Sequence, residues 1–279
     1  MSTSLASHRY GKSHIRLVKV RRDREPHGLV DLTIDVQLEG AFESIYTSGD
    51  NTSCIATDTM KNTVYALARQ HDLVHVETFG ERLGRHFLEQ PAVSRARISA
   101  AEHRWDHASV GGRPHPHAFT QPTGERRTAD VVVDRNAVEV TSGLANLVVL
   151  KTTDSAFAGF PRDRFTTLHE TDDRILATSI TASWRYRPGM TDFGARARIR
   201  EGLIRTFAAH ESRSVQHTLY AMAEAALDTC ADIDEVTLRL PNRHHLLVDL
   251  EPFGLDNPNE VYLPTEEPHG LIEATLRRS

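Results

Sequence analysis

The sequence is poor in cysteine and in lysine. Cys54 and Cys230 are the only cysteines among its 279 residues, and we expect both in apolar surroundings. Isolated cysteines of this kind are typical of reduced core residues and give no basis for a disulfide framework. Only four of the 33 basic residues are lysine. Because lysine can lose its proton when desolvated and arginine cannot, these lysines either mark positions that need a titratable amine or reflect chance in an arginine-rich chain.

Long apolar runs and blocks of basic residues are also missing. No stretch approaches the roughly 18 apolar residues that span a bilayer, and the N-terminal MSTSLASHRYGK lacks the apolar centre of a signal peptide. The formal net charge of -5 argues against nucleic acid as the main partner. The C-terminal Arg277-Arg278-Ser279 is not a peroxisomal tripeptide. These features predict a cytoplasmic protein that binds neither membranes nor nucleic acid.

Motifs for common cofactors and catalytic centres are absent too. The sequence has no GxGxxG or GxxxxGKS loop, which disfavours a nucleotide cofactor, and no GxSxG, which disfavours a hydrolase. Sixteen histidines raise the alternative of a metal site, but there is no HExxH. His244 and His245 are adjacent, and adjacent residues on a strand point to opposite faces. Histidine pairs without a third ligand predict no metal site.

Hydrophobic periodicity predicts two similar halves. Leu32, Ile34, Val36 and Leu38 alternate with polar residues, which predicts a half-buried strand paired with the preceding segment 10–22. Each half then reads as a strand pair, two helices and a second strand pair. The other expected strands are 93–105, 128–134, 137–153, 174–187, 236–240 and 245–250, and the expected helices follow Asp58 and span 74–89, 192–209 and 213–231. The segment 111–124, rich in Gly, Pro and His, is expected only to separate strands.

Strand pairs beside helix pairs predict an α+β fold, with paired helices on one face of an antiparallel sheet. We expect residues 1–136 to form the first half and 137–279 the second. The repeat lies in the order of the elements. At residue level it is weak, because NTVYALA at 62–68 resembles HTLYAMA at 217–223 while these helices have different ranks in their halves.

A turn-rich segment leads into the first long helix near residue 57. Residues 48–51 read as a turn, and apolar residues recur at three- and four-residue steps over 60–68. Thr57, Asp58 or Thr59 is expected to be the N-cap. The helix start would present a hydroxyl and a carboxylate beside free backbone N–H groups, which favour anions. Simple helix capping is the alternative interpretation.

Three phenylalanines, Phe157, Phe160 and Phe165, precede Arg174 at the start of an expected strand. A guanidinium fork beside a phenylalanine face suits a flat, polar, anionic ring, because the fork takes adjacent acceptors and the ring stacks. The alternative is that Phe157 belongs to the core and Arg174 to an ion pair at its rim.

A series of separate motifs also runs along the chain. They are Tyr10-Gly11-Lys12, Ile55-Ala56-Thr57-Asp58, Lys61-Asn62-Thr63, Pro114-His115-Pro116-His117, Leu150-Lys151-Thr152-Thr153, the set Phe157, Phe160, Phe165, Leu168 and Arg174, Ser214-Val215-Gln216, and Leu240-Pro241-Asn242-Arg243-His244. In this order and spacing they resemble the urate oxidase (uricase) family over nearly the full length of the chain. The match is more specific than any single motif.

The resemblance implies two tandem T-fold (tunnelling fold) halves, chains paired into closed barrels, and a homotetramer with active sites at subunit interfaces. It implies oxidation of urate with O2 and water to 5-hydroxyisourate and hydrogen peroxide in purine degradation, with no metal or organic cofactor. Position by position, Lys12, Thr57 and His244 match catalytic residues. The matches to substrate-binding residues are Thr57, Asp58, Phe157, Arg174, Val215, Gln216 and Asn242.

These side chains suit that chemistry. Lys12 would act as the base once desolvation favours its neutral form, and Thr57 and His244 would pass the proton on. Gln216 offers one donor and one acceptor to a neighbouring N–H and C=O edge, and the Asn242 amide could hold O2, peroxide or water. Two alternatives remain: another T-fold purine or pterin enzyme, such as a metal-dependent cyclohydrolase, or a non-catalytic purine-binding protein.

Overall fold

The structure is a computed structural model that describes residues 3–121 and 124–278. The chain ends (1–2 and Ser279) and residues 122–123 of the expected connection lie outside these ranges. The chain divides into two compact units, which are described separately below. Unit 1 is Met1–Gly143 with Arg185–Gly194, and unit 2 is Leu144–Trp184 with Ala195–Ser279. The expected division after residue 136 stays a prediction.

Unit 1 contains antiparallel strands in the order β1-β2-β3-β6. The strands are β1 (Tyr10–Arg21), β2 (Gly28–Gly40), β3 (Val93–His103) and β6 (Arg126–Asp134). The alternation predicted for β2 is confirmed, because Leu32, Ile34, Val36 and Leu38 are all fully buried.

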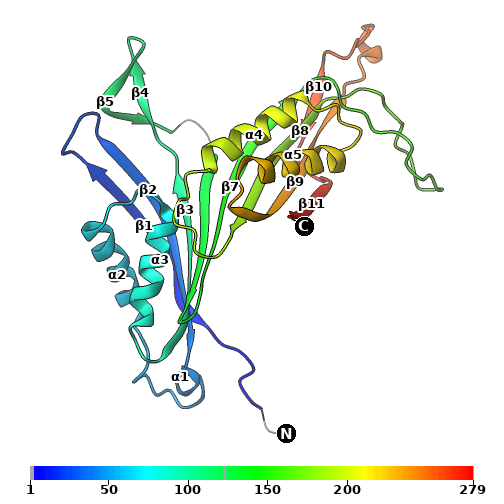
Figure 1. Cartoon of the computed structure of the whole chain (residues 1–279). Coiled ribbons are helices and arrows are strands. Elements are labelled where there is room, and N and C mark those ends of the chain that lie inside the picture. The colour runs from blue at the N-terminus through cyan, green and yellow to red at the C-terminus, as the bar shows by residue number, and fades with distance from the viewer. Residues whose placement is uncertain (1–2, 122–123, 279) are drawn as a thin grey trace. The chain divides into compact units, whose positions relative to one another are not determined.

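Helices α2 (Thr57–Gln70) and α3 (Val76–Leu88) cover one face of these strands (Figure 1). A short helix, α1 (Glu43–Thr47), was not predicted. α3 lies so close to β6 that a Cβ at Gly84 would stand 2.5 Å from Cγ2 of Val133. Glycine therefore sets the distance between helix and sheet, since a larger residue would push the close-packed strand away.

Strands β4 (Asp106–Val110) and β5 (Arg113–Thr120) form a two-stranded sheet of their own. The expectation that 111–124 is only a connection was wrong. Val110 pairs with Arg113, and Gly111 and Gly112 between them have φ values of 60° and 76°. Two consecutive residues with positive φ make the tight turn that matches the twist of a hairpin.

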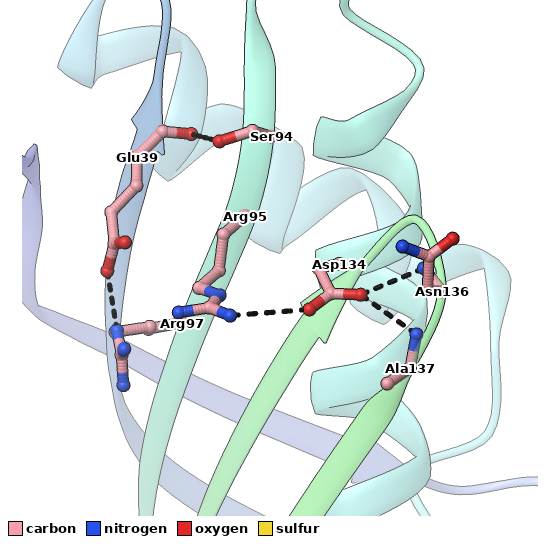
Figure 2. Close-up of polar contacts among 7 residues, drawn as sticks. All are labelled: Glu39, Ser94, Arg95, Arg97, Asp134, Asn136 and Ala137. Carbon is pink, nitrogen blue, oxygen red and sulfur yellow. Dashed lines mark hydrogen bonds and ion pairs between the residues drawn. The ribbon is translucent and has the colours of Figure 1, made fainter.

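The turn after β6 is built around one carboxylate, with ion pairs tying the nearby strands together (Figure 2). Arg95 Nη2 on β3 lies 3.4 Å from Oδ2 of Asp134. Oδ1 of Asp134 accepts from the backbone N–H groups of Asn136 and Ala137, both at 2.8 Å. These two bonds, with a smaller contribution from Arg95, hold the pKa of Asp134 below its usual value. Asp134 thus shapes the turn into β7 (Val138–Lys151).

Unit 2 packs a helix pair beside strands, as predicted (Figure 1). The elements are α4 (Arg196–Ala209), α5 (Val215–Thr229), β9 (Ile233–Leu247), β10 (Tyr262–Thr265) and β11 (Leu271–Arg277), with most of β8 (Leu176–Tyr186) and the end of β7. A one-turn 3-10 helix spans Glu251–Phe253. Within the described ranges, no helix is both long and apolar enough to cross a bilayer.

β9 replaces the two strands expected at 236–240 and 245–250, so that expectation was wrong. The strand stays continuous because its partner changes along its length. It pairs with β11 up to Pro241 and with β10 from His244 onward. Pro241 has no N–H to donate, and it lies where one ladder ends, so it does not interrupt the strand.

Candidate active site

Lys12 lies on β1 beside an irregularity in the sheet. Regular pairing with β2 runs to Lys12, opposite Val36, and resumes at Ile15, opposite Ile34. Between these two pairs, β1 has two residues where β2 has one. One of the two residues of β1 is His14, which has a φ of 57°. Such a bulge bends the strand and re-aims nearby side chains.

Gly11 permits a close approach of the two strands directly before Lys12. A Cβ at Gly11 would stand 1.8 Å from the backbone oxygen of Val36, closer than any side chain tolerates. Glycine is therefore required here for β1 to pack against β2, and this packing fixes the backbone that carries Lys12.

Thr57 and Asp58 lie in the first turn of α2. Ala56 is the N-cap, so the expectation that a residue of 57–59 caps the helix was wrong. The Asp58 carboxylate accepts from Lys61 Nζ at 2.5 Å instead, and the N-cap position makes no side-chain capping bond in the described chain. The N–H groups of the first turn remain available to a ligand.

The charge of Lys12 reaches this helix end. The hydrogen bond from Lys61, together with its charge, holds the pKa of Asp58 below its usual value, and Lys12 adds a smaller lowering. Thr57 is partly buried and Asp58 is exposed. Unit 1 therefore brings Lys12 near the start of α2, where Thr57 and Asp58 lie.

In unit 2, a loop between β7 and β8 carries the predicted ring-binding residues. Backbone hydrogen bonds join Phe157 and Thr171 in both directions, at 2.8 and 3.1 Å. Asp173 accepts from Thr153 Oγ1 at 2.7 Å and from Ser155 N at 3.2 Å. These bonds, that from Thr153 first, hold the pKa of Asp173 below its usual value. Asp173 thus fastens the two ends of the loop together.

Arg174 presents its guanidinium to the ring of Phe157. Its Cζ lies 5.2 Å from the ring centroid, and Phe157 itself stacks on Phe160 at 5.0 Å. Arg174 Nε is buried and has no hydrogen-bond partner in the part of the chain that the structure describes. Burial also lowers the pKa of the guanidinium. Because an unpaired buried donor is costly, Arg174 is a candidate donor to an acceptor on a ligand.

A cavity of about 170 Å³ lies beside this pair. Its lining includes four predicted site residues: Phe157, Arg174, Asn242 and His244. The other lining residues are Leu168, His169, Thr171, Ile175, Arg243, His245 and Leu246. Asn242 and His244 come from the stretch of β9 where its pairing partner changes. The cavity is smaller than the roughly 300–1,000 Å³ of drug-sized sites and suits a small ring.

Sequence reasoning did not name Thr171 or His245 as site residues. Thr171 belongs to no motif, and its backbone pairing with Phe157 is visible only in the structure. His245 was expected to face away from His244, yet both line the cavity. The His-His dipeptide was the one available signal for His245.

Val215 and Gln216 begin α5 and do not line this cavity. Val215 is buried and Gln216 is exposed. Ser212, just before the helix, pairs with Ser155 in the loop that carries Phe157, and Ser212 O accepts from Ala156 N at 2.7 Å. The helix start is therefore attached to the ring-binding loop.

A larger cavity, about 530 Å³, lies in unit 1 beside the turn after β6. None of the predicted site residues lines it. Arg85 in its wall pairs with Glu81 at 2.7 Å, and Asp134 is occupied by the turn. The smaller cavity combines an aromatic face with an unsatisfied arginine, so its chemistry makes it the better candidate despite its size.

Histidines also gather outside the cavity. The rings of His115 and His117 lie 4.5 Å apart, and those of His210 and His217 lie 4.3 Å apart. Across residues 3–121 and 124–278, no three or more His, Cys, Asp and Glu side chains are grouped so as to hold a metal ion.

Comparison with known proteins gives a family assignment. The family model "Uricase" matches residues 8–132 and 140–273. A uricase from Arthrobacter globiformis is 46% identical over 276 residues, covering 98% of this chain and 90% of the relative. A uricase from Aspergillus flavus is 40% identical over 97% of this chain and 96% of its own length.

Solved structures agree with this assignment. The crystal structure of uricase from Arthrobacter globiformis has a TM-score of 0.94 at 45% identity, covering 100% of this chain and 96% of the other. A uricase from Bacillus fastidious, 24% identical, has a TM-score of 0.87 over 98% of this chain and 94% of the other, which shows the shared fold. The α+β fold with tandem T-fold halves is that of these proteins. The chain belongs to the uricase family.

Proposed function

We propose that this chain oxidises urate with O2 and water to 5-hydroxyisourate and hydrogen peroxide. The observation that carries the proposal is the unsatisfied Arg174 beside the face of Phe157, in a small cavity that Asn242 and His244 also line. Urate is a planar anion edged by alternating N–H and C=O groups. A cation beside an aromatic face, with further polar groups nearby, matches such a ring.

Each binding residue takes one part of the ring. Arg174 grips an edge through its N–H fork, while Phe157 stacks on the face. The Gln216 amide meets a neighbouring N–H and C=O pair. Val215, at the same helix start, supplies backbone and apolar contact, and the first turn of α2, with Thr57 and Asp58, supplies further N–H donors.

The remaining residues handle protons and oxygen. Lys12 and Thr57 remove a proton from the bound urate, which makes the ring electron-rich. Urate then gives two electrons to O2, which takes up two protons and leaves as hydrogen peroxide. A water molecule adds its hydroxyl to the oxidised ring carbon. His244 relays protons, and the Asn242 amide N–H holds O2, then peroxide or water.

We also propose that the chain forms a homotetramer, in which Lys12, Thr57 and Asp58 of one subunit complete the site that unit 2 of another begins. This arrangement is what resemblance to the family implies, and it fits the location of the predicted residues in two units. A cytoplasmic location likewise stays a prediction, which fractionation of the source cells tests.

The test is a urate consumption assay. Purified chain should remove the ultraviolet absorbance of urate and release hydrogen peroxide in equal amount. Activity should survive exhaustive chelation and dialysis, because the proposed steps use only side chains and O2. Urate that stays intact would refute the function and favour a non-catalytic ring-binding protein. Activity lost on chelation and restored by zinc, copper or iron would refute the cofactor-free mechanism.

A further inference from the structure

Single side chains of β1 fasten helix α2 at each of its ends. At the C-terminal end, Lys19 Nζ donates to Ala68 O at 2.8 Å and to His71 O at 2.7 Å. Before the N-terminal end, the backbone N–H of Ile55 donates to the Tyr10 hydroxyl at 2.8 Å. The second contact lies beside the predicted catalytic residues and belongs to none of the roles assigned above.

Tyr10 is itself firmly held. Its ring meets the fully buried Phe42 edge to face, with centroids 4.9 Å apart. Burial first, and then a hydrogen bond with Cys54, raises the pKa of Tyr10 to about 12. The hydroxyl therefore stays protonated at neutral pH, and its oxygen accepts the hydrogen bond from Ile55 N.

The positions of the two bonded groups matter for the proposed chemistry. Tyr10 precedes Lys12 by two residues on β1, and Ile55 precedes Thr57 by two residues at the start of α2. The N-cap, Ala56, has no side-chain hydrogen bond to fix this helix end from within.

We propose that Tyr10 is a positioning residue whose hydroxyl fixes the start of α2 on β1 and so sets Thr57 relative to Lys12. The proposal rests on the proposed urate oxidation for its effect on rate. The fastening itself is a property of the fold and is tested separately below.

The kinetic test compares two tyrosine variants. Tyr10→Phe keeps the ring against Phe42 and removes only the hydroxyl. Tyr46→Phe is the matched control, because its hydroxyl donates to Arg9 O at 3.1 Å, also on the approach to β1, and has no bond to residues 55–57. We expect Tyr10→Phe to lower kcat about 10- to 100-fold, as a misplacement of about 1 Å does. KM should rise less than kcat falls, because the ring-binding residues of unit 2 are untouched and only the N–H donors in the first turn of α2 shift.

Equal kcat values for Tyr10→Phe and Tyr46→Phe would overturn the proposal, and so would a rise in KM with kcat unchanged. An inactive wild-type chain in the same assay would refute the proposed function instead. Amide hydrogen exchange then tests the fastening without turnover and without a variant. The Ile55 amide should be as protected as those within α2, and free exchange at Ile55 would overturn the proposal.

Discussion

At the scale of single residues, Arg174 dominates the candidate site. Its Nε is buried without a partner among the described residues, and its guanidinium stands over Phe157. Leaving a buried donor of this kind unsatisfied costs stability, and an acceptor on a bound ligand would remove that cost. Asp173, the preceding residue, holds the loop end in place through Thr153 and Ser155. The loop around Phe157 is in this way attached to the start of β8.

The first prediction concerns this guanidinium. Arg174→Lys keeps the charge but replaces a planar fork by a point donor. We expect urate binding to weaken by about 1.5–3 kcal/mol, the usual contribution of a hydrogen bond to a charged group. Isothermal titration with a non-reacting urate analogue measures this loss. Arg162→Lys, in the same loop but outside the cavity lining, is the control. Unchanged affinity in Arg174→Lys would mean that another residue holds the anion.

A second prediction follows from His210. Its Nε2 lies 3.1 Å from His217 Nδ1. Burial first, and then the charges of His217 and Lys151, lower the pKa of His210. The unfolded chain therefore binds the proton more tightly than the folded chain. The stability that neutral His210 contributes is complete above the unfolded pKa of about 6.5 and is lost as pH falls through the folded pKa.

Urea unfolding between pH 7.5 and 5 tests this prediction. The free energy of unfolding should decrease as the pH is lowered. For His210→Gln this decrease should be less steep than for the wild type. His269→Gln, at an exposed histidine, should keep the wild-type slope. A His210→Gln slope equal to the wild-type slope would contradict the prediction.

At the scale of elements, the two units repeat a contact that the sequence concealed. Lys19 on β1 donates to the carbonyl of His71 after α2, and Lys151 at the end of β7 donates to the carbonyl of His210 after α4. In both units the next helix begins five residues after that histidine. Two of the four lysines thus supply a compact donor to a helix end, where positive charge is favoured.

This repeat also relates Glu77 to Gln216. Each is the second residue of the second long helix in its unit, α3 in unit 1 and α5 in unit 2. Gln216 is exposed near the ring-binding loop, whereas Glu77 is fully buried and pairs with Arg127 at 2.5 Å and with the hydroxyl of Ser142. At this equivalent position, unit 2 therefore has an exposed amide, Gln216, and unit 1 has a carboxylate, Glu77, that forms a buried ion pair.

Glu77→Gln gives the third prediction. It keeps the volume of the side chain but leaves Arg127, which is nearly buried, with an uncharged amide at 2.5 Å and only the more distant, partly exposed carboxylate of Glu102 at 3.7 Å. Breaking one partner of a buried ion pair costs about 3–5 kcal/mol. Urea unfolding at neutral pH measures the loss. Glu39→Gln removes the half-exposed partner of Arg97 and should cost about 1 kcal/mol or less. Equal losses for the two variants would show that burial does not decide the energetics here.

The elements also show which parts of the fold the sequence encodes locally. Period-two alternation predicted β2, and helical periodicity predicted both helix pairs. Both predictions were possible because an element with one buried face has apolar residues that recur at the period of that element. Features that depend on distant partners escaped prediction. β9 is one strand because β11 and β10 pair with it in turn, and the start of β11 comes 30 residues after Pro241. The Gly111-Gly112 hairpin turn did have a local signal, which was interpreted only as a break.

The candidate site was predictable to a similar extent. Motif order pointed to Phe157, Arg174, Asn242 and His244, and the structure brings these four to one cavity. Their roles remain predictions. Thr171 could not be predicted from the sequence, because its place beside the cavity follows from backbone pairing with Phe157. The contact of Tyr10 could not be predicted either, because its partner is a backbone N–H and carries no sequence signal.

At the scale of the whole molecule, the predicted residues fall into two sets. Lys12, Thr57 and Asp58 belong to unit 1, and the ring-binding residues belong to unit 2. If each site forms between two subunits, it takes Lys12, Thr57 and Asp58 from one subunit and the ring-binding residues from the other. A chain with Lys12→Ala and a chain with Gln216→Ala should then complement each other in a mixed oligomer, because one site of the mixed pair carries both lesions and the other carries neither.

The last prediction makes this quantitative. Equal amounts of the two inactive variants, unfolded together and refolded, should form mixed pairs in about half of the dimers. Each mixed pair has one intact site of two, so roughly a quarter of wild-type activity should return. Mixing the folded variants should restore little, because a closed barrel held by many strand hydrogen bonds exchanges subunits slowly. Native mass spectrometry confirms that mixed oligomers form. Refolded mixtures as inactive as the separate variants, with mixed oligomers present, would place Lys12 and Gln216 in the site of a single subunit and exclude the interface arrangement.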